Sequence, residues 1–214
     1  EPGMRVVYIA AGAGGMYCGS CMHDNTLAAA LMRKGVDVAL IPTYTPLRTD
    51  ETNVSLDHLF YGGINIFLQE KLGLFRHTPR FVDWLFDRPG LVRWVSDRFS
   101  ASTNAADLGA LTVSVLSGEA GHQHKALAQM TDWIAHHHQP HLVQLTNSMF
   151  AGTARYLKAQ LGVPILCAVQ GEELFLDALP EPHRTRAREV LRERSRDVDG
   201  FIAPCQYYAD FMAA

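Results

Sequence analysis

The sequence predicts an α/β fold with a doubly wound parallel sheet. Three observations favour it: short apolar runs without alternation, helical segments between them, and glycines at the turns. Uninterrupted apolar runs are typical of strands buried on both faces, and strands that alternate with helices at this spacing favour a parallel sheet with right-handed crossovers. We expect a single domain over residues 1–214, with a helical insertion at about 60–138.

The first 42 residues form a clear strand, helix, strand unit. Val6–Ala10 and Val36–Ile41 are the expected strands. Between them we expect a helix that is capped by Asp24 or Asn25. It ends at Gly35, because that glycine follows a cationic last turn.

The same alternation returns after residue 140. Apolar runs predict strands at 141–145, 163–169 and 200–203, and helical patterns predict helices at 149–161 and 181–196 and from 205 onward. Counted with the first unit, these segments make five parallel strands.

Between these units, the alternation stops over about residues 60–138. Aromatic and aliphatic residues recur there at helical spacing, with Pro79 and Pro89 as interruptions, and Gly118–His138 predicts a further long helix. Core packing is the simpler interpretation of the aromatic stripe, and a surface for an acceptor or a partner is the alternative.

Composition excludes several classes of protein. The formal net charge of -3 gives no electrostatic reason to expect nucleic acid as a partner. No run approaches the roughly 20 apolar residues of a transmembrane helix. The four cysteines are too few for a disulfide scaffold and suit a reducing compartment. We therefore expect a cytoplasmic protein, with peripheral attachment to the inner membrane as a further option.

The stretch AAGAGGMYCGS, residues 10–20, joins the first strand to the first helix. A glycine-rich turn before a helix exposes backbone N–H groups that suit a phosphate or a carboxylate. A dinucleotide fingerprint fits less well. Gly12 and Gly14 match it, but Tyr17 occupies the third glycine position and no acidic residue ends the second strand. Both departures weigh against nicotinamide or flavin.

Cys18 and Cys21 form a Cys-x-x-Cys pair in the same stretch. At a helix start, the helix dipole could acidify their thiols for redox chemistry, whereas the simpler interpretation is that they are small packing residues. A metal site needs more ligands, but Cys167 and Cys205 stand alone and His23 is only one candidate. No metal is expected.

Two further clusters of titratable residues are interpreted as exposed. The run His136–His138, with His141 nearby, falls at a helix end before Pro140 and is expected to be solvated. The arginines of 184–196 alternate with glutamates and predict an exposed helix face with salt bridges rather than a phosphate clamp.

Three motifs together resemble the group 1, or family 4-like, retaining glycosyltransferases. Gly14-Gly15-Met16 precedes a helix and strand that end LAAALMRKGVDVALI. PHLVQLTNSMFAGTARYLKAQLGVPILCAVQGEELF is similar to the sequence around the acceptor pocket of that family, and DVDGFIAPCQYYADFM to the segment before its interdomain linker. The resemblance covers about residues 4–58 and 139–214.

The resemblance implies a GT-B enzyme, in which two Rossmann-like domains face each other across a cleft. This chain would be the N-terminal, acceptor-side domain, with the C-terminal donor-binding domain absent from it, so that the fragment alone should be inactive. The implied partners are a nucleotide-diphosphate sugar, an acceptor that is a small molecule, a glycan or lipid-linked, and the C-terminal domain of the same protein. The sugar would pass to an acceptor hydroxyl with retention of configuration and without a cofactor.

The resemblance and the fold also imply a set of binding residues. The turn would face the donor diphosphate or the acceptor, and Gln170 matches a position that is often histidine in the family. Because glutamine cannot take a proton, a general-base role there is in doubt. Other polar residues follow predicted strands, where ligands of open α/β sheets bind; Glu172 and Glu173 are interpreted equally as caps or as sugar contacts. The full set is Gly14, Gly15, Met16, Tyr17, Thr43, Tyr44, Asn147, Ser148, Gln170, Glu172 and Glu173.

No catalytic residue is assigned, because the acidic pair that engages the donor would lie in the other domain. Two other classes stay open. One is a nucleotide-dependent oxidoreductase domain. The other is a non-catalytic binding module that uses the aromatic helical insertion.

Overall fold

The computed structural model describes residues 3–12, 16–60 and 105–213, with only the backbone at 105–107. These residues form an α/β domain in which helices flank a five-stranded, all-parallel sheet. The fold is Rossmann-like and doubly wound, as the sequence predicts. The described part of the expected insertion, from residue 105 on, is helical, and the segment with Pro79 and Pro89 lies outside the described residues.

The five strands lie in the order β2-β1-β3-β4-β5. Their bounds are β1 Arg5–Ala10, β2 Asp37–Pro42, β3 Leu142–Leu145, β4 Ile165–Ala168 and β5 Gly200–Ile202. The chain moves outward from β1 to β2, then returns to place β3 on the other side of β1, so that the strand order reverses between β1 and β3. Ligands of open α/β sheets bind at the carboxyl ends of the strands near such a reversal.

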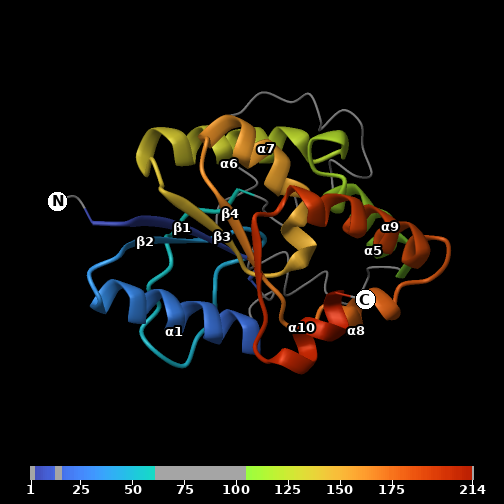
Figure 1. The fold of residues 1–214 in the computed structure, drawn as a ribbon, viewed down its shortest axis with the longest axis horizontal. Helices are drawn as coiled ribbons and strands as arrows, with labels where there is room; N and C mark the ends of the chain where they lie inside the picture. The colour runs from blue at the N-terminus through green and yellow to red at the C-terminus, as the bar shows by residue number, and fades with distance from the viewer. Residues whose placement is uncertain (1–2, 13–15, 61–104, 214) are drawn as a thin grey trace.

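Helices cover both faces of this sheet. In Figure 1, α1 lies on one face and α6 and α7 lie on the other. The helical segments are α1 Gly19–Arg33, α5 Ala105–Leu116, η2 Gly118–Ala120, α6 His124–His137, η3 Ser148–Phe150, α7 Ala151–Leu161, α8 Glu173–Asp177, α9 His183–Arg194, η4 Ser195–Asp197 and α10 Gln206–Ala213.

The side chains of β1 show why its sequence is apolar at consecutive positions. Val7 and Ile9 belong to the core cluster that packs against α6 and α7, whereas Val6 and Tyr8 belong to the cluster beneath α1. Successive side chains of a strand point to opposite faces, so a strand covered on both sides must be apolar at every position. The prediction of strands buried on both faces is confirmed for β1.

Two expectations about helix ends are wrong. Cys18, not Asp24 or Asn25, is the N-cap of α1, and both of those polar residues are buried within the helix. The segment 118–138 is also not one helix: the turn η2 is followed by an extended Gly121, and α6 begins only at His124.

A close approach between η2 and α7 constrains the first residue of this segment. Gly118 has φ +61°, and a Cβ there would lie 1.9 Å from the carbonyl oxygen of Gly152 in α7. Only glycine tolerates both the left-handed backbone and this contact. Helical periodicity was present in the sequence, but it could not reveal that another helix presses on the chain at this point.

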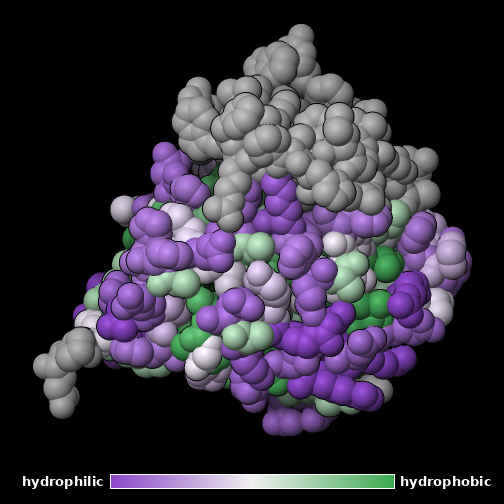
Figure 2. Space-filling view, turned by 90° about the horizontal axis from the view of Figure 1, so that it is seen from above, coloured by the Kyte–Doolittle hydropathy of each residue, from purple (hydrophilic) through white to green (hydrophobic). Residues whose placement is uncertain are grey.

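The outer surface over α6 and α7 is mostly hydrophilic, with scattered apolar residues (Figure 2). The exposed ion pairs expected for the arginine-rich helix are present: Arg186 pairs with Glu189 at 3.1 Å and Arg188 pairs with Asp177. Arg194 is the exception, because only 5% of it is exposed. Among the described helices, none combines the length and the apolar character that crossing a membrane requires.

Candidate functional site

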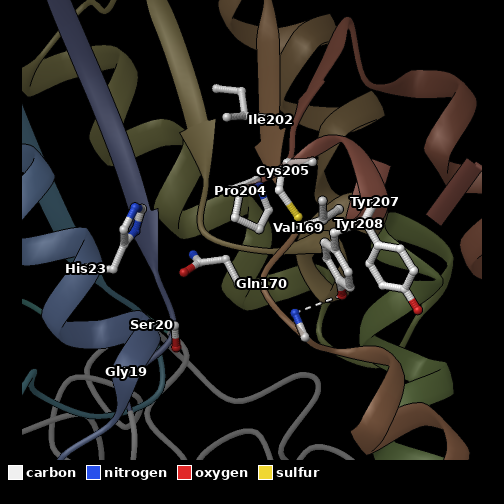
Figure 3. Close-up of a pocket in the computed structure, with 13 residues that line it drawn as sticks. Gly19, Ser20, His23, Val169, Gln170, Ile202, Pro204, Cys205, Tyr207 and Tyr208 are labelled. Atoms are coloured by element: carbon white, nitrogen blue, oxygen red, sulfur yellow. Dashed lines mark hydrogen bonds between the residues drawn. The ribbon is translucent and has the colours of Figure 1, made fainter. Parts of the chain in front are cut away.

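A cavity of about 580 Å³ opens at the carboxyl ends of β4 and β5. Figure 3 shows the first turn of α1 on one side, the loop after β4 in the centre, and the start of α10 on the other side. The lining residues are Gly19, Ser20, His23, Ala168, Val169, Gln170, Gly171, Ile202, Ala203, Pro204, Cys205, Tyr207 and Tyr208. The cavity therefore lies at the sheet edge where the fold places ligands.

The wall formed by α1 carries the positive end of that helix. Cys18 has extended backbone torsions as the N-cap, and the helix begins at Gly19, so the first backbone N–H groups have no partner one turn earlier. The Sγ atom of Cys18 lies 3.1 Å from the Oγ atom of Ser20. This wall suits an anion or a partly negative oxygen.

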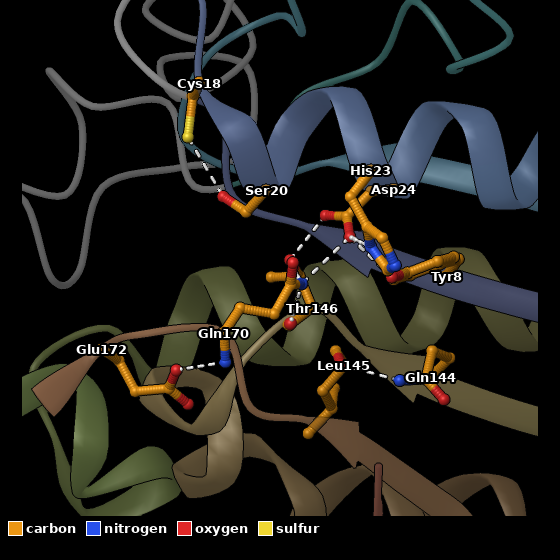
Figure 4. A network of polar contacts seen from close by, with 10 residues as sticks. All are labelled: Tyr8, Cys18, Ser20, His23, Asp24, Gln144, Leu145, Thr146, Gln170 and Glu172. Atoms are coloured by element: carbon orange, nitrogen blue, oxygen red, sulfur yellow. Dashed lines mark hydrogen bonds and ion pairs between the residues drawn. The ribbon is translucent and has the colours of Figure 1, made fainter. Parts of the chain in front are cut away.

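A buried carboxylate lies directly behind this wall. Asp24 is only 1% exposed. Its Oδ1 accepts a hydrogen bond from the Tyr8 hydroxyl at 2.6 Å, and its Oδ2 accepts one from the Thr146 hydroxyl at 2.5 Å. The Nε2 atom of Gln170 is a third donor, 3.2 Å from Oδ1 (Figure 4). Burial, followed by the neighbouring Asp24, raises the pKa of Tyr8, which therefore keeps its proton as a donor.

Gln170 links this network to the cavity. Its Nε2 also donates to the carbonyl oxygen of Thr146 at 2.6 Å, and its backbone N–H donates to Glu172 at 2.6 Å. All three side-chain bonds are made by the amide nitrogen, which leaves the amide oxygen as the end available to a ligand. Among the predicted binding residues that the structure describes, Gln170 is the one that lines the cavity.

His23 precedes Asp24 in the helix, and its side chain lines the cavity. Adjacent helical positions differ by about 100°, so Asp24 is buried while His23 is exposed and lines the cavity. The Nδ1 atom of His23 lies 3.4 Å from Oδ1 of Asp24. In the tautomer that carries its hydrogen on Nδ1, this hydrogen is directed at the carboxylate, and Nε2 is the nitrogen that can accept a hydrogen bond from a ligand.

The wall opposite α1 is built around Tyr208. Its phenolic oxygen accepts a hydrogen bond from the backbone N–H of Gly171 at 2.8 Å, and its hydroxyl donates to Glu173. Burial, followed by the bond to Glu173, raises the pKa of Tyr208. These bonds fix the loop after β4 against α10, whereas the neighbouring Tyr207 is 78% exposed at the cavity.

Several predicted binding residues have structural roles instead. The hydroxyl of Thr43 is buried and donates to the carbonyl oxygen of Ala10 at 2.7 Å. Tyr44 packs against Phe150 with 5.4 Å between ring centroids, and burial raises the pKa of Tyr44. Asn147 accepts a hydrogen bond from the backbone N–H of Met149 and so caps η3.

Glu172 is a brace between two loops. It is buried, and its carboxylate accepts the backbone N–H groups of both Ser148, at 2.8 Å, and Gln170. Glu172 occupies the N-cap position of α8, but its side chain makes no capping hydrogen bond to that helix. The side chain of Ser148 is also buried. Neither residue lines the cavity described above.

Part of the glycine-rich turn is described, and part is not. Met16 and Tyr17 are 69% and 57% exposed, and the guanidinium of Arg48 lies 4.4 Å from the centre of the Tyr17 ring. Gly12 is required by its backbone: φ is +82°, and a Cβ would lie 2.1 Å from the carbonyl oxygen of Thr45. Gly14 and Gly15 lie outside the described residues.

The sequence interpretation missed Asp24, Thr146, His23 and Tyr208 as parts of the site. One signal was available for Asp24: an acidic residue on the inner side of an alanine-rich helix must find hydrogen-bond donors or stay out of the core. His23 then follows as its neighbour. Thr146 and Tyr208 carried no signal, because their roles depend on contacts between segments far apart in the chain.

The described residues also bear on a metal site. Within the described ranges no group of three or more His, Cys, Asp or Glu side chains is placed to hold a metal ion. In the histidine run, His136 and His137 are exposed as expected, whereas His138 is partly buried.

Comparison with known proteins adds no assignment. A scan against protein-family models finds no match for this chain, and a search of the curated proteins finds no significant match.

Proposed function

We propose that this domain is the acceptor-side half of a retaining glycosyltransferase. The reaction is transfer of a sugar from a nucleotide-diphosphate sugar to an acceptor hydroxyl. The observation that carries the proposal is the cavity at the carboxyl ends of β4 and β5, with polar and aromatic side chains on opposite walls. The sequence resemblance described above points to the same class of enzyme.

The lining has the chemistry that sugar recognition needs. Sugar hydroxyls both donate and accept hydrogen bonds, and Gln170, Ser20 and His23 offer both functions on one side of the cavity. Tyr207 and Tyr208 offer aromatic rings opposite them, against which the apolar C–H face of a sugar ring can pack.

His23 and the start of α1 have separate roles in the proposed reaction. His23 accepts a hydrogen bond from the acceptor hydroxyl through Nε2, while Asp24 holds the ring by Nδ1. Departure of the diphosphate develops negative charge, and the positive end of the α1 helix dipole stabilises such charge. A donor-binding lobe supplies the remaining contacts, as in the family that the sequence resembles. We place the reaction in the cytoplasm, at the inner membrane where the acceptor is lipid-linked.

The direct test is a transfer assay with the full-length natural protein. UDP-, GDP- and ADP-sugars are supplied with a panel of acceptors, and the anomeric configuration of the product is read by NMR. We expect transfer with retention from one nucleotide class. Failure of the full-length protein to bind any nucleotide sugar, measured by calorimetry, would overturn the proposal.

Substitutions then test the cavity itself. His23→Ala should lower kcat about 100-fold, the lower end of general-base effects. Gln170→Ala should weaken acceptor binding and raise KM more than it lowers kcat. The matched control is Arg186→Ala on the exposed face of α9, whose ion pair with Glu189 is far from the cavity lining. Equal activity of all three variants would exclude this cavity as the acceptor site.

A further inference from the structure

The two cysteines at the start of α1 have no part in the proposed transfer reaction. Cys18 is the N-cap and Cys21 lies in the first turn, three residues on. Residues at this spacing in a helix have Cβ atoms about 5–6 Å apart, and a disulfide needs about 3.5–4.5 Å. Because the N-cap lies outside the regular helix, with extended backbone torsions, Cys18 can rotate toward Cys21.

The surroundings of the two thiols differ. Cys18 is partly exposed, and its sulfur lies beside the Ser20 hydroxyl. Cys21 is only 2% exposed and packs with apolar residues of β1 and β2, including Val6 and Val38. A reagent from solvent therefore reaches Cys18 first, and Cys21 can react only with Cys18.

The acidities of the thiols follow the same order. Partial burial alone would raise the pKa of Cys18, but hydrogen bonds from the Ser20 hydroxyl and from the backbone N–H groups of Cys21 and Ser20 outweigh it and lower the pKa. Burial raises the pKa of Cys21 to about 12, with Cys18 and Asp24 adding to the effect. The outer sulfur is thus the better nucleophile near neutral pH, and the inner one stays protonated.

We propose that Cys18 and Cys21 are a reversible dithiol–disulfide pair at the start of α1, beside the cavity, oxidised by exchange with a small-molecule disulfide. The Cys18 thiolate attacks one sulfur of that disulfide, whose S–S bond breaks and releases one thiolate. The sulfur of Cys21 then attacks Cys18, the mixed disulfide breaks, and the second thiolate leaves with the proton from Cys21. Two protein thiols and one disulfide give one protein disulfide and two small thiols.

Oxidation of the two cysteines would change the cavity through the residues that lie between them. Gly19 and Ser20 both line the cavity. A bond between Cys18 and Cys21 takes away the thiol that now contacts the Ser20 hydroxyl. The disulfide form would therefore present a changed wall at the start of α1.

Glutathione disulfide is the probe for the test, and mass spectrometry is the readout. The protein is used with Cys205→Ser, because Cys205 is an exposed thiol on the opposite wall. As the concentration of oxidised glutathione increases, we expect the mass of the protein to fall by that of two hydrogen atoms. Digestion should then yield a peptide in which Cys18 is linked to Cys21. Absence of this linkage in excess oxidised glutathione would overturn the proposal.

Two variants separate attack from resolution. Cys21→Ala should trap a glutathione adduct on Cys18, and Cys18→Ala should form no adduct, because Cys21 is buried. An adduct on Cys21 in the second variant contradicts the assigned order. Where a variant does not fold, iodoacetamide competition in the otherwise unchanged protein gives the same information, since Cys18 should be alkylated several-fold faster than Cys21.

A further pair of variants tests the cause of the reactivity. Ser20→Ala removes the hydroxyl beside Cys18 and should shift the pH profile of Cys18 alkylation upward. Thr26→Ala removes an exposed hydroxyl of the same helix that contacts Glu51, and should leave the profile in place. These readouts need no sugar transfer, so the redox pair and the proposed function can fail separately.

Discussion

Asp24 in α1 and Arg194 at the end of α9 are both buried charged residues, 1% and 5% exposed, but their surroundings differ. The Asp24 carboxylate has three hydrogen-bond donors within 3.2 Å. Arg194 donates from Nη2 to the carbonyl oxygen of Ser117 at 3.0 Å, whereas its Nε and Nη1 atoms are buried without a hydrogen bond. Its Nη1 lies 3.6 Å from Glu119.

The difference follows from what each residue joins. The donors to Asp24 come from β1, from the end of β3 and from the loop after β4, so the carboxylate holds together the elements around the cavity. Arg194 joins α9 to the turn before η2, away from the cavity lining. The buried charge beside the cavity thus has a complete set of hydrogen bonds, whereas the one at the helix junction has an incomplete set.

Asp24→Ala should give the largest loss of stability. It leaves the buried donors of Tyr8, Thr146 and Gln170 without their acceptor, and we expect a loss of about 3 kcal/mol in the free energy of unfolding, measured in urea. Asp24→Asn keeps the shape but faces those donors with an NH₂ group, so it should lose about 1–3 kcal/mol. A loss below about 0.5 kcal/mol for both variants would show that the network does not support the fold.

Arg194→Met should cost less than either Asp24 variant. The change removes the desolvation of a buried charge together with its imperfect contacts, and Glu119 keeps its ion pair with Arg155. We expect a loss of about 1 kcal/mol in the same urea experiment. A loss as large as that of Asp24→Ala would contradict the conclusion that the contacts of Asp24 stabilise the fold more than those of Arg194.

Lowering the pH should reduce the stability by a smaller amount, and the residues responsible are histidines rather than Asp24 or Arg194. Burial is the main cause that lowers the pKa of His58 and of His138, so the unfolded chain binds protons first as the pH falls through about 6.5. Stability is therefore complete above that pH and declines below it. Calorimetry between pH 7.5 and 5.5 should show a falling Tm. His138→Gln should flatten the decline, whereas His136→Gln, at an exposed position, should not.

The exposed face of α9 should give the smallest effect. Arg186 and Glu189 are both more than half exposed, so solvent screens their ion pair. Arg186→Ala should change the free energy of unfolding by less than about 0.5 kcal/mol at any salt concentration. A loss above about 1 kcal/mol that disappears in high salt would mean that this exposed pair contributes more to the helix than buried Arg194 does.

The sequence predicts β1, β2 and β4 well because most of their residues are buried, on both faces of the sheet. Burial forces continuous apolar runs, which a single chain displays directly, and β1, β2 and β4 lie within a residue or two of the expected ranges. Helix ends were harder. Asp24 resembles a cap because caps are usually acidic or amide residues, but here its side chain points into the network and a cysteine occupies the cap position.

The candidate site could be predicted only where a residue follows a strand. Gln170 was found this way, since its position after β4 places it at the cavity. Thr43, Tyr44 and Asn147 follow strands too, yet they satisfy backbone groups or pack against rings. For Thr43 and Tyr44 the role depends on tertiary contacts with Ala10 and Phe150, and no local pattern records these. Asn147 caps a backbone N–H only two residues on, which is a local contact.

The side-chain amide of Gln170 lies between the cavity and the buried Asp24 carboxylate. Ligand binding at this amide is therefore coupled to the hydrogen bonds of Asp24. Any ligand that draws the amide nitrogen away must leave Asp24 one donor short. Such a ligand then binds more weakly, because part of its binding free energy is spent on breaking contacts of the β1–α1–β2 unit. By thermodynamic linkage, a change that stabilises this unit also weakens the binding of the ligand. A ligand that binds to the amide oxygen alone leaves the hydrogen bond to Asp24 in place. The orientation of one side-chain amide therefore decides whether ligand binding destabilises the domain.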